Sequence, residues 1–490
     1  MTVRWLKVLL SIVLFIPGYP CPDATIGDSP LTYVTQSGDT LEAVAARFRV
    51  KAEHITSTQP IPQNGLLPPG LLLYLPLRAQ DGSLAPWLLP DSEVIYSPSA
   101  LNFDVAAYLN ETEGYLKAHD EYMRSSGETS AAEIIARIAL ENSISPRLLL
   151  ALLEYRCHCV LGFPDENIEA DNLLKIDIPG KVGLYRQLGW AISRLSLGYY
   201  GWRTGLFTEL VFTDSVAQRI PPNLNPGSVA LEFLFAQLYD HQAWQRAVDL
   251  EEGFPALYRR MFGDPWQRAL KVEPLFPADL RQPPLILPFE PGKVWSFTSG
   301  PHKAWETDGA LAALDFAPAS MESGCLPSPE WVVAMADGVV ARSEYGAVVL
   351  DLDDPSSGLP SDGNEQSGWA ILYMHVDRRE RVPLGARLQA GERIGHPSCE
   401  GGPASGTHIH IARKYNGEWI AADGPLPFVM DGWVAHAGSR PYRGSLNKDG
   451  KAIVANWFSP NTSFIVRLEE VAHPSRLDLY RRTRCCIPYE

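Results

Sequence analysis

The sequence is short of positive charge and of long hydrophobic runs. Its 42 Lys and Arg residues face 57 Asp and Glu residues, so the formal net charge at pH 7 is −15. Proteins that bind nucleic acids neutralise phosphates with clustered Lys and Arg, and this balance excludes nucleic acid as a partner. Beyond the N-terminus, no segment reaches the roughly 18 consecutive apolar residues that a membrane-spanning helix needs. We therefore expect no stable membrane insertion once the N-terminal segment is removed.

A short apolar run does occur at the N-terminus. Arg4 and Lys7 precede Val8–Ile16, which a proline and a glycine then end. Positive residues followed by an apolar run of this length are typical of an export signal. We predict that residues 1–22 are a signal peptide without a lipid anchor and that the protein is secreted or associated with the cell envelope. A buried N-terminal helix is the alternative.

Cysteine is also rare, with seven residues in the chain. Removal of Cys21 with the signal leaves an even number, which suits disulfide formation in an oxidising compartment. Cys325 and Cys399 lie in the same C-terminal region, and we predict a disulfide between them. Free thiols, or pairing with another cysteine, are the alternatives. The other cysteines are Cys157, Cys159, Cys485 and Cys486.

Proline, in contrast, is abundant, and it divides the chain. At roughly 150 residues per domain, 490 residues predict about three domains. A polar stretch near residues 79–90 and a Pro-rich segment near 276–291 are typical of boundaries. The sequence therefore predicts a multidomain α+β protein. Its predicted parts are the regions 31–76, 95–280 and 287–440, and an extension, 441–490, that packs on the last of them.

The region 31–76 has the pattern of two short strands around a helical centre. Residues 33–41 predict a strand and then a Gly-Asp-Thr turn that caps a helix, and a second helix and a returning strand follow. Over nearly its whole length this region resembles a LysM module. The resemblance implies a βααβ fold that binds glycans containing N-acetylglucosamine, and a small structural domain is the alternative. The glycan-contacting residues that it implies are Gly38, Asp39, Thr40, Gln59 and Pro60.

The region 95–280 is predicted to be helical throughout. Ser145 followed by Pro146 is a strong helix start, and the segment Asn225–Leu231 follows later in the region. These segments resemble the all-α, lysozyme-like fold of lytic transglycosylases, which cleave glycan strands.

Catalysis in that family uses a Glu followed by Ser near the end of the Ser-Pro helix. Arg156 and Cys157 occupy the corresponding positions here. Arginine stays protonated and cannot transfer a proton at neutral pH. Glu154 lies two residues before Arg156, about 200° around the helix, so it would face away from the cleft. We predict a non-catalytic domain, and a glycosidase that uses Glu154 or an unrelated helical spacer are the alternatives.

The region 287–440 carries a His-x-His pair. Successive side chains of a strand point to opposite faces, so His408 and His410 share one face while Ile409 points into the core. His302 and Asp315 offer a further imidazole and a carboxylate. Two histidines and one carboxylate leave tetrahedral zinc a fourth position for water, as in catalytic zinc sites. We predict one Zn²⁺ bound by His302, Asp315 and His410.

The two remaining histidines of these segments suit catalysis. His408 is predicted to take a proton from water as general base, and His375 to stabilise the oxyanion that develops on the carbonyl oxygen. Asp308 is an alternative carboxylate ligand, because it also lies between His302 and the first strand that follows.

These segments resemble the lysostaphin-type zinc endopeptidases, also called LytM-like or β-lytic. The resemblance implies a mainly antiparallel β fold of the duplicated hybrid motif type. The twelve residues between His302 and Asp315 are similar to the spacing of the staphylolytic and β-lytic branch. In the family the ligands correspond to His302, Asp315 and His410, and the catalytic histidines to His375 and His408. All five positions are retained, which distinguishes the chain from inactive members that lack ligands.

The sequence therefore predicts a peptidoglycan hydrolase, a zinc endopeptidase that cleaves stem peptides or cross-bridges and is targeted to glycan strands by LysM. Two alternatives remain open. One is a catalytically silent binding or regulatory protein of the envelope, and the other is a glycan-cleaving enzyme that uses the region 95–280.

Overall fold

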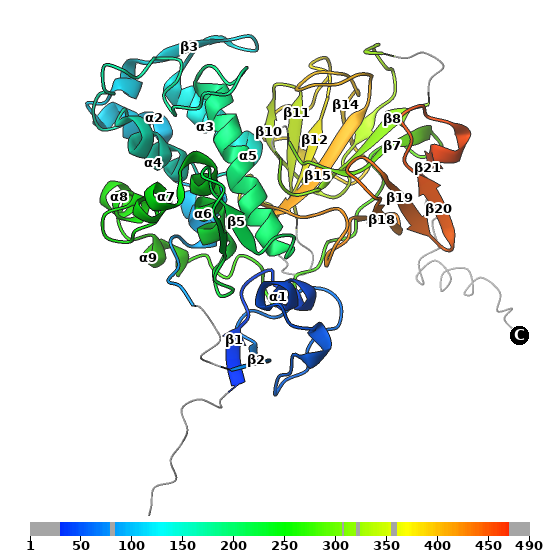
Figure 1. Ribbon diagram of the computed structural model, residues 1–490. Coiled ribbons are helices and arrows are strands. Elements are labelled where there is room, and N and C mark those ends of the chain that lie inside the picture. The colour runs from blue at the N-terminus through cyan, green and yellow to red at the C-terminus, as the bar shows by residue number, and fades with distance from the viewer. Residues whose placement is uncertain (1–29, 79–83, 306–307, 320–323, 354–359, 470–490) are drawn as a thin grey trace, which may run out of the picture.

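A computed structural model of the protein describes residues 30–78, 84–305, 308–319, 324–353 and 360–469. It contains a small first unit (30–78), a helical region (84–280) and a β-rich region (281–469) (Figure 1). None of the described helices is long and apolar enough to cross a membrane. The predicted signal peptide, Cys21, Cys485 and Cys486 lie outside the described residues.

The first unit is a two-stranded antiparallel sheet packed on a helix. Strand β1 (Pro30–Val34) pairs with β2 (Leu72–Arg78), and α1 (Leu41–Phe48) lies between them in the sequence. The hydroxyl of Thr40 accepts a hydrogen bond from the backbone N–H of Ala43 and so caps α1, as the Gly-Asp-Thr turn predicts.

The predicted second helix of this unit is wrong. Within the described residues, a single 3₁₀ turn, Ala52–His54, stands where that helix was expected. Prolines at 60, 62, 68 and 69 follow closely. Proline cannot donate a backbone hydrogen bond and disfavours helical geometry in the residue before it, so the segment crosses back to β2 without a second helix.

The helical region is built around its longest helix, α5, which packs closely against α6 and lies between the other helices and the β-rich region (Figure 1). The predicted helix start at Pro146 is confirmed, with Ser145 as the N-cap residue. Pro226 also begins a helix, after the N-cap residue Asn225. The helices are α2 (Val105–Glu111), α3 (Ala131–Asn142), α4 (Pro146–Cys157), α5 (Leu184–Arg203), α6 (Pro226–Leu238), α7 (His241–Ala247), α8 (Phe254–Phe262) and α9 (Pro265–Ala269).

The expectation that this region is entirely α-helical is wrong in detail. It also contains two small antiparallel hairpins, whose strands are too short and polar to show the periodicity on which a strand prediction rests. The strands are β3 (Asp120–Met123) with β4 (Gly127–Ser130), and β5 (Glu209–Val211) with β6 (Ala217–Arg219).

The β-rich region has the predicted, mainly antiparallel architecture. A nine-stranded sheet has the order β13-β10-β11-β12-β15-β8-β7-β21, with β16 paired to β15. The predicted boundary at residue 440 does not end this sheet, because β21 from the extension pairs with the outer edge of β7. The sheet strands are β7 (Val294–His302), β8 (Ala313–Pro318), β10 (Gly338–Glu344), β11 (Ala347–Leu352), β12 (Trp369–Met374), β13 (Arg387–Leu388), β15 (Ile409–Tyr415), β16 (Glu418–Trp419) and β21 (Phe464–Val466).

Two smaller sheets accompany it. One pairs β9 (Val332–Val333) with β14 (Arg393–Gly395). The other has the order β17-β18-β19-β20 and contains β17 (Val429–Met430), β18 (Trp433–Ala437), β19 (Gly444–Lys448) and β20 (Lys451–Val454).

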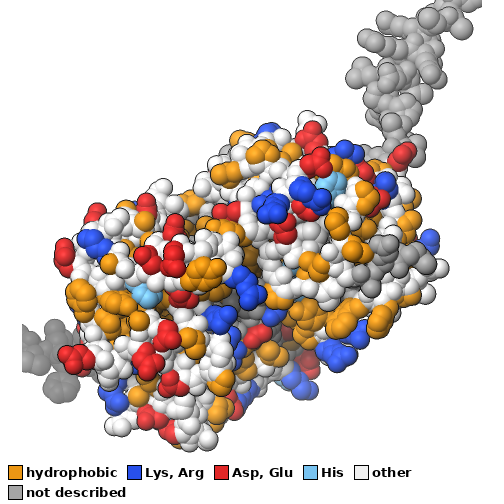
Figure 2. All heavy atoms as spheres, turned by 90° about the horizontal axis from the view of Figure 1, so that it is seen from above, with side chains coloured by type: hydrophobic (Ala, Val, Ile, Leu, Met, Phe, Trp, Pro, Cys, Tyr) orange, Lys and Arg blue, Asp and Glu red, His pale blue; other side chains and the backbone are white. Residues whose placement is uncertain are grey.

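The two faces of the large sheet are buried against different partners. Leu314 and Ile411 belong to the core of the β-rich region. Ala313, Leu372 and Ala412, on the opposite face, belong to one hydrophobic cluster with residues of α3 and α5. The helical region thus covers one face of the sheet. Figure 2 shows the two regions from above as lobes in direct contact, with acidic, basic and apolar side chains interspersed on the exposed surface.

Arg203, at the end of α5, joins all three parts. Its guanidinium binds both carboxylate oxygens of Glu418 in β16, at 2.8 and 2.7 Å, and also donates to the backbone carbonyl of Ser37 in the first unit. Asp91 of the helical region lies 3.6 Å away. The Arg203 and Glu418 side chains are 8% and 2% exposed. Because buried charges are costly without partners, this junction holds the three parts in one arrangement.

Breaking the junction is expected to destabilise the protein. Glu418→Gln leaves the buried Arg203 charge without its bidentate partner, so the free energy of unfolding should fall by about 3–5 kcal/mol, measured by urea unfolding. The matched control is Glu209→Gln, which breaks an exposed pair with Arg49 between the first unit and the helical region. An exposed pair contributes about 0–1 kcal/mol. Equal losses in the two variants would contradict a special role for Arg203.

A second buried acid, Glu232 in α6, is expected to make stability depend on pH. Its side chain is buried, one carboxylate oxygen has no hydrogen-bond partner among the described residues, and burial raises its pKa to about 8. The unfolded chain has the ordinary value of about 4.3. The stabilisation that protonated Glu232 gives the folded state is therefore complete below about pH 4.3 and is lost as the pH rises through about 8. Between pH 5 and 9, ionisation of Glu232 should lower the free energy of unfolding of the unmodified protein by up to about 4 kcal/mol. The Glu232→Gln variant has no ionisable group at this position, so its free energy of unfolding should not show this decrease.

Urea unfolding at pH 5, 7 and 9 measures this difference. Glu53→Gln, at an exposed position beside Lys51, is the control and should follow the unmodified protein at each pH. Parallel curves for Glu232→Gln and the unmodified protein would contradict the prediction.

Candidate metal centre

Three neighbouring strands bring the predicted ligands together. His302 ends β7, Asp315 lies within β8 and His410 within β15. In the antiparallel register, His410 is directly opposite Asp315, and β7 pairs with the other edge of β8. His410 and Asp315 alternate with core residues, as the His-x-His pattern predicts, so they lie on the sheet face that the helical region covers.

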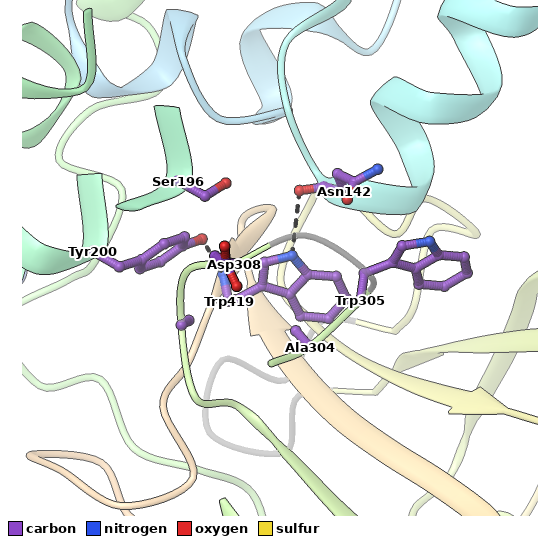
Figure 3. Close-up of a pocket in the computed structure, with 8 residues that line it drawn as sticks. Asn142, Ser196, Tyr200, Ala304, Trp305, Asp308 and Trp419 are labelled. Atoms are coloured by element: carbon purple, nitrogen blue, oxygen red, sulfur yellow. Dashed lines mark hydrogen bonds between the residues drawn. The ribbon is translucent and has the colours of Figure 1, made fainter. Parts of the chain in front are cut away.

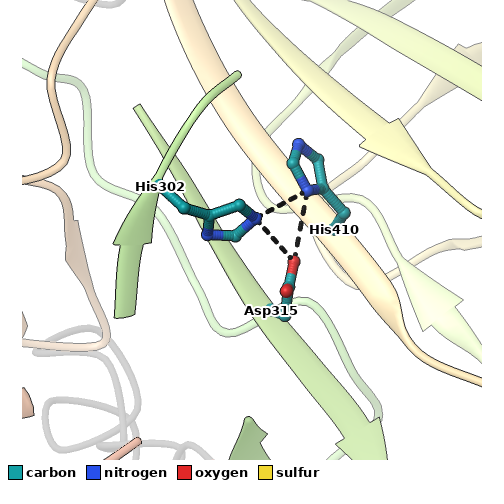
Figure 4. Close-up of side chains that lie close together, drawn as sticks. All are labelled: His302, Asp315 and His410. Atoms are coloured by element: carbon teal, nitrogen blue, oxygen red, sulfur yellow. Dashed lines mark hydrogen bonds and ion pairs between the residues drawn. The ribbon is translucent and has the colours of Figure 1, made fainter. Parts of the chain in front are cut away.

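The three side chains converge on one point (Figure 4). His302 Nε2 lies 3.1 Å from His410 Nδ1 and 3.3 Å from Asp315 Oδ1, and His410 Nδ1 lies 3.2 Å from Asp315 Oδ1. All three residues are buried. The predicted ligand set is therefore brought together by the fold.

Backbone carbonyls determine which ring nitrogen of each histidine carries the proton. His302 Nδ1 lies 2.9 Å from the carbonyl oxygen of Gly300, and His410 Nε2 lies 3.0 Å from that of Ala304. A carbonyl oxygen only accepts hydrogen bonds, so these nitrogens are the N–H donors. The opposite nitrogens, His302 Nε2 and His410 Nδ1, present lone pairs to the centre.

This arrangement fits a cation. Two nitrogen lone pairs and a carboxylate oxygen, with no hydrogen-bond donor for Asp315 Oδ1 among the described residues, face one another at 3.1–3.3 Å. Tetrahedral zinc with ligands at about 2.0–2.1 Å separates its ligand atoms by about 3.3 Å. Burial opposes charge on Asp315, but His302 and His408 lower the pKa of this carboxyl well below its usual range. The donor set therefore suits Zn²⁺.

The two predicted catalytic histidines flank this cluster. The ring centroid of His375, just after β12, lies 4.4 Å from that of His408 and 6.1 Å from that of His410. His375 Nδ1 donates to the carbonyl oxygen of Glu400 at 2.7 Å, and His408 Nδ1 to that of Gly406 at 2.8 Å. In their neutral forms both rings therefore offer Nε2 as a hydrogen-bond acceptor. Burial, and then the neighbouring histidines, lower the pKa of His375 to about 3.

The predicted disulfide is confirmed and lies next to these histidines. Cys325 and Cys399 are bonded, with Cα atoms 5.7 Å apart. Cys399 precedes Glu400, whose carbonyl binds His375, and the backbone N–H of Thr407 donates to the carbonyl of Gly324. The bridge thus ties together two loops beside the centre. Cys157 and Cys159 pair with each other, so neither is a partner of Cys325 or Cys399.

Asp308, the alternative ligand, lies elsewhere. Its carboxylate accepts a hydrogen bond from the hydroxyl of Ser193 at 3.0 Å and pairs with Arg194 at 3.2 Å, both on α5. It does not belong to the cluster of His302, Asp315 and His410.

The lysozyme-like positions have structural partners. The Glu154 carboxylate is buried and accepts hydrogen bonds from the backbone N–H groups of Val160 and Leu161, at 3.0 and 2.9 Å. Arg156 donates to the carbonyl of Leu174 and to the hydroxyl of Tyr239. These contacts give Glu154 and Arg156 structural roles, and a non-catalytic helical region stays a prediction.

The predicted glycan contacts divide into two groups. Gly38 and Asp39 are buried: Gly38 lies against the Arg203 guanidinium, and Asp39 forms a buried 2.7 Å ion pair with Arg47. Thr40 caps α1. Gln59 and Pro60 are exposed. Of the predicted glycan-binding residues, Gln59 and Pro60 are therefore the two that face solvent fully.

Sequence reasoning missed Tyr442. Its ring stacks on that of His302, with centroids 4.5 Å apart and planes 23° apart, and its backbone N–H donates to the carbonyl of Pro301. Tyr442 follows β18 by five residues and belongs to no recognisable motif, so only the tertiary structure shows that it packs on the candidate ligand His302.

Part of this chain is similar to a known protease. A family model described as LasA, N-terminal domain, matches residues 87–276. The chain is 25% identical over 345 residues to Protease LasA of Pseudomonas aeruginosa strain UCBPP-PA14, and equally to that of strain PAO1. Each alignment covers 69% of this chain and 75% of the relative. The relative is a protease, and this chain holds a His-Asp-His cluster that could bind a metal ion. The chain is a zinc metallopeptidase.

Solved structures similar to this metallopeptidase include the M23 metalloprotease pseudoalterin from the deep sea, at 22% identity and a TM-score of 0.30, covering 36% of this chain and 96% of that one. Another is the catalytic domain of the antimicrobial peptidase lysostaphin from Staphylococcus simulans, at 20% identity and a TM-score of 0.19, covering 26% and 87%. The family match at 87–276 covers most of the metallopeptidase's helical region, which is therefore LasA-like.

Proposed function

We propose that this metallopeptidase is a peptidoglycan hydrolase that cleaves peptide bonds of stem peptides or cross-bridges with one zinc ion bound by His302, Asp315 and His410. The observation that carries the proposal is the convergence of two imidazole lone pairs and one carboxylate oxygen at 3.1–3.3 Å in a buried site. The resemblance of residues 287–440 to lysostaphin-type endopeptidases supports peptidoglycan as the substrate, and lysostaphin itself is an antimicrobial peptidase.

When bound, zinc supplies Lewis-acid activation of a water molecule and of the scissile carbonyl. His408 is then the general base. Its Nδ1–H is held by Gly406, so the Nε2 lone pair is free to take a proton from the attacking water. As the new C–O bond forms and the C–N bond breaks, the same proton passes from His408 to the leaving amine nitrogen.

We propose for His375 a role other than the oxyanion stabilisation that the sequence predicted. Stabilising an oxyanion requires a hydrogen-bond donor, but the neutral ring directs its only N–H at Glu400. Its low pKa keeps it neutral. We assign His375 the second hydrogen of the attacking water, which its Nε2 accepts. The two rings, 4.4 Å apart, thereby orient the nucleophile, and a bound metal ion would supply the stabilisation of the oxyanion.

The first unit is proposed to bind glycan strands in the manner of LysM, through the exposed loop that contains Gln59 and Pro60. The Arg203 junction attaches this unit rigidly to the peptidase. Binding to the polymer would raise the local concentration of peptide bonds near the metal centre. The disulfide Cys325–Cys399 supports a site of action outside the cytoplasm, because such bonds persist in oxidising compartments.

Digestion of purified peptidoglycan tests the proposal. The zinc-loaded full chain should release fragments with new amino termini, and the Asp315→Ala variant should release none. New reducing or anhydro-sugar ends would instead indicate glycan cleavage by the helical region. Binding without any cleavage by the zinc-loaded protein would favour a regulatory envelope protein.

A further inference from the structure

The loop that follows His302 is held by the helical region. Trp305 is buried in the hydrophobic cluster that α3 and α5 form with the sheet, and the Arg342 guanidinium lies 5.6 Å from its ring centroid. Farther along, Asp308 forms a reciprocal pair with Ser193 of α5. The Ser193 hydroxyl donates to the Asp308 carboxylate at 3.0 Å, and the Asp308 backbone N–H donates to the Ser193 oxygen at 3.1 Å.

Close packing reinforces these polar contacts. Gly309 has a φ of +142°, and a Cβ atom placed there would lie 2.9 Å from the Cβ of Ser196 and 3.2 Å from the ring of Tyr200, both on α5. Figure 3 shows Ala304, Trp305 and Asp308 on one side of a small cavity and Ser196 and Tyr200 on the other. At Gly309 the chain therefore rests directly on α5.

The same loop touches a metal ligand. The carbonyl of Ala304 accepts the Nε2–H of His410 at 3.0 Å, and Ala304 immediately precedes Trp305. A hydrogen bond to the second ring nitrogen determines the tautomer of a ligating histidine and the direction in which its lone pair points. Here that hydrogen bond leaves the Nδ1 lone pair of His410 directed at Asp315 and His302.

We propose that α5 tunes the zinc affinity of the centre through this loop, with Ser193 and Asp308 as positioning residues. The inference rests on the proposed role of His410 as a zinc ligand. If the loop loosens, the Ala304 carbonyl no longer holds the Nε2–H. The His410 proton can then move to Nδ1, where it blocks metal binding. Asp308, which is not one of the three candidate ligands, thus acts on the centre through its pairing with Ser193 of the helical region.

Zinc dissociation constants of the full-length protein, measured by competition with a chromogenic chelator, test this proposal. Ser193→Ala and Asp308→Ala are each expected to weaken zinc binding by about 10-fold, the low end of the effect of removing partners behind metal ligands. Ser193→Thr keeps the hydroxyl, so this variant should bind zinc with the affinity of the unmodified protein. Far-UV circular dichroism and thermal unfolding of the zinc-free proteins monitor the fold.

The matched control is Ser143→Ala. The Ser143 hydroxyl also joins the two regions, by donating to the carbonyl of Gly417 at 2.5 Å, which lies outside the loop after His302. Its variant should keep the zinc affinity of the unmodified protein. Unchanged affinity in Ser193→Ala and Asp308→Ala would overturn the inference, and so would an equal loss in Ser143→Ala. An unmodified protein that binds no zinc would instead overturn the proposed function.

Discussion

Replacing any one of His302, Asp315 or His410 with alanine is expected to remove the bound zinc and nearly all peptidase activity. Each residue provides one of the three atoms that face the centre. Two ligands do not hold catalytic zinc tightly, and without the ion neither the water nor the carbonyl is activated. We expect a loss of about 10³-fold or more in kcat/KM, since the ion contributes several kcal/mol of transition-state stabilisation.

Elemental analysis of the purified proteins and peptidoglycan digestion measure the two effects. The unmodified protein should contain one zinc ion per chain. His396→Ala is the matched control, because His396 is another buried histidine of the β-rich region, bound to Glu330 and Glu380 away from the centre. It should retain zinc. A ligand variant with full zinc content and full rate would show that its residue is wrongly assigned.

The second large effect is expected at the flanking histidines. His408→Ala and His375→Ala should keep one zinc per chain but lose about 10²-fold or more in kcat, because their Nε2 atoms accept protons or hydrogen bonds from the attacking water. Both rings are held by hydrogen bonds to backbone carbonyls. Their removal therefore leaves the three ligand atoms in place.

Zinc content and single-turnover rates separate the possible outcomes. Loss of zinc in either variant would make that histidine a ligand. A full rate in His408→Ala would exclude it as the general base. A smaller effect at His375 than at His408 is also consistent with the structure, since His408 transfers the proton and His375 only orients the water.

Much of the candidate site follows from local sequence pattern. The alternation His408-Ile409-His410 places both histidines on one strand face, and that face is correct in the structure. The helix start at Pro146 also depends only on neighbouring residues, which is why it was predictable. The prediction of a second helix in the first unit also rested on local pattern, and it was wrong because several prolines follow a weak helical pattern.

The choice between carboxylates, by contrast, depends on strand register. Asp315 and Asp308 both follow His302 in the sequence, and only the pairing of β8 with β15 sets Asp315 opposite His410. Register is decided by long-range packing of the alternating core residues, which a local pattern does not contain. The stacking of Tyr442 on His302 has the same origin, since the two are 140 residues apart.

By itself, then, the sequence determined the donor groups of the candidate site: two imidazoles and a carboxylate, which we propose for zinc, two further histidines, which we propose for the water, and a cysteine pair that bridges the adjacent loops. Tertiary structure alone decided how those groups act. Carbonyls of Gly300, Ala304, Gly406 and Glu400 choose the ring tautomers, and α5 and Arg203 join the centre to the rest of the chain. The physical reason is that a side chain's identity is local, whereas its protonation, orientation and burial depend on distant atoms that only the folded chain brings near.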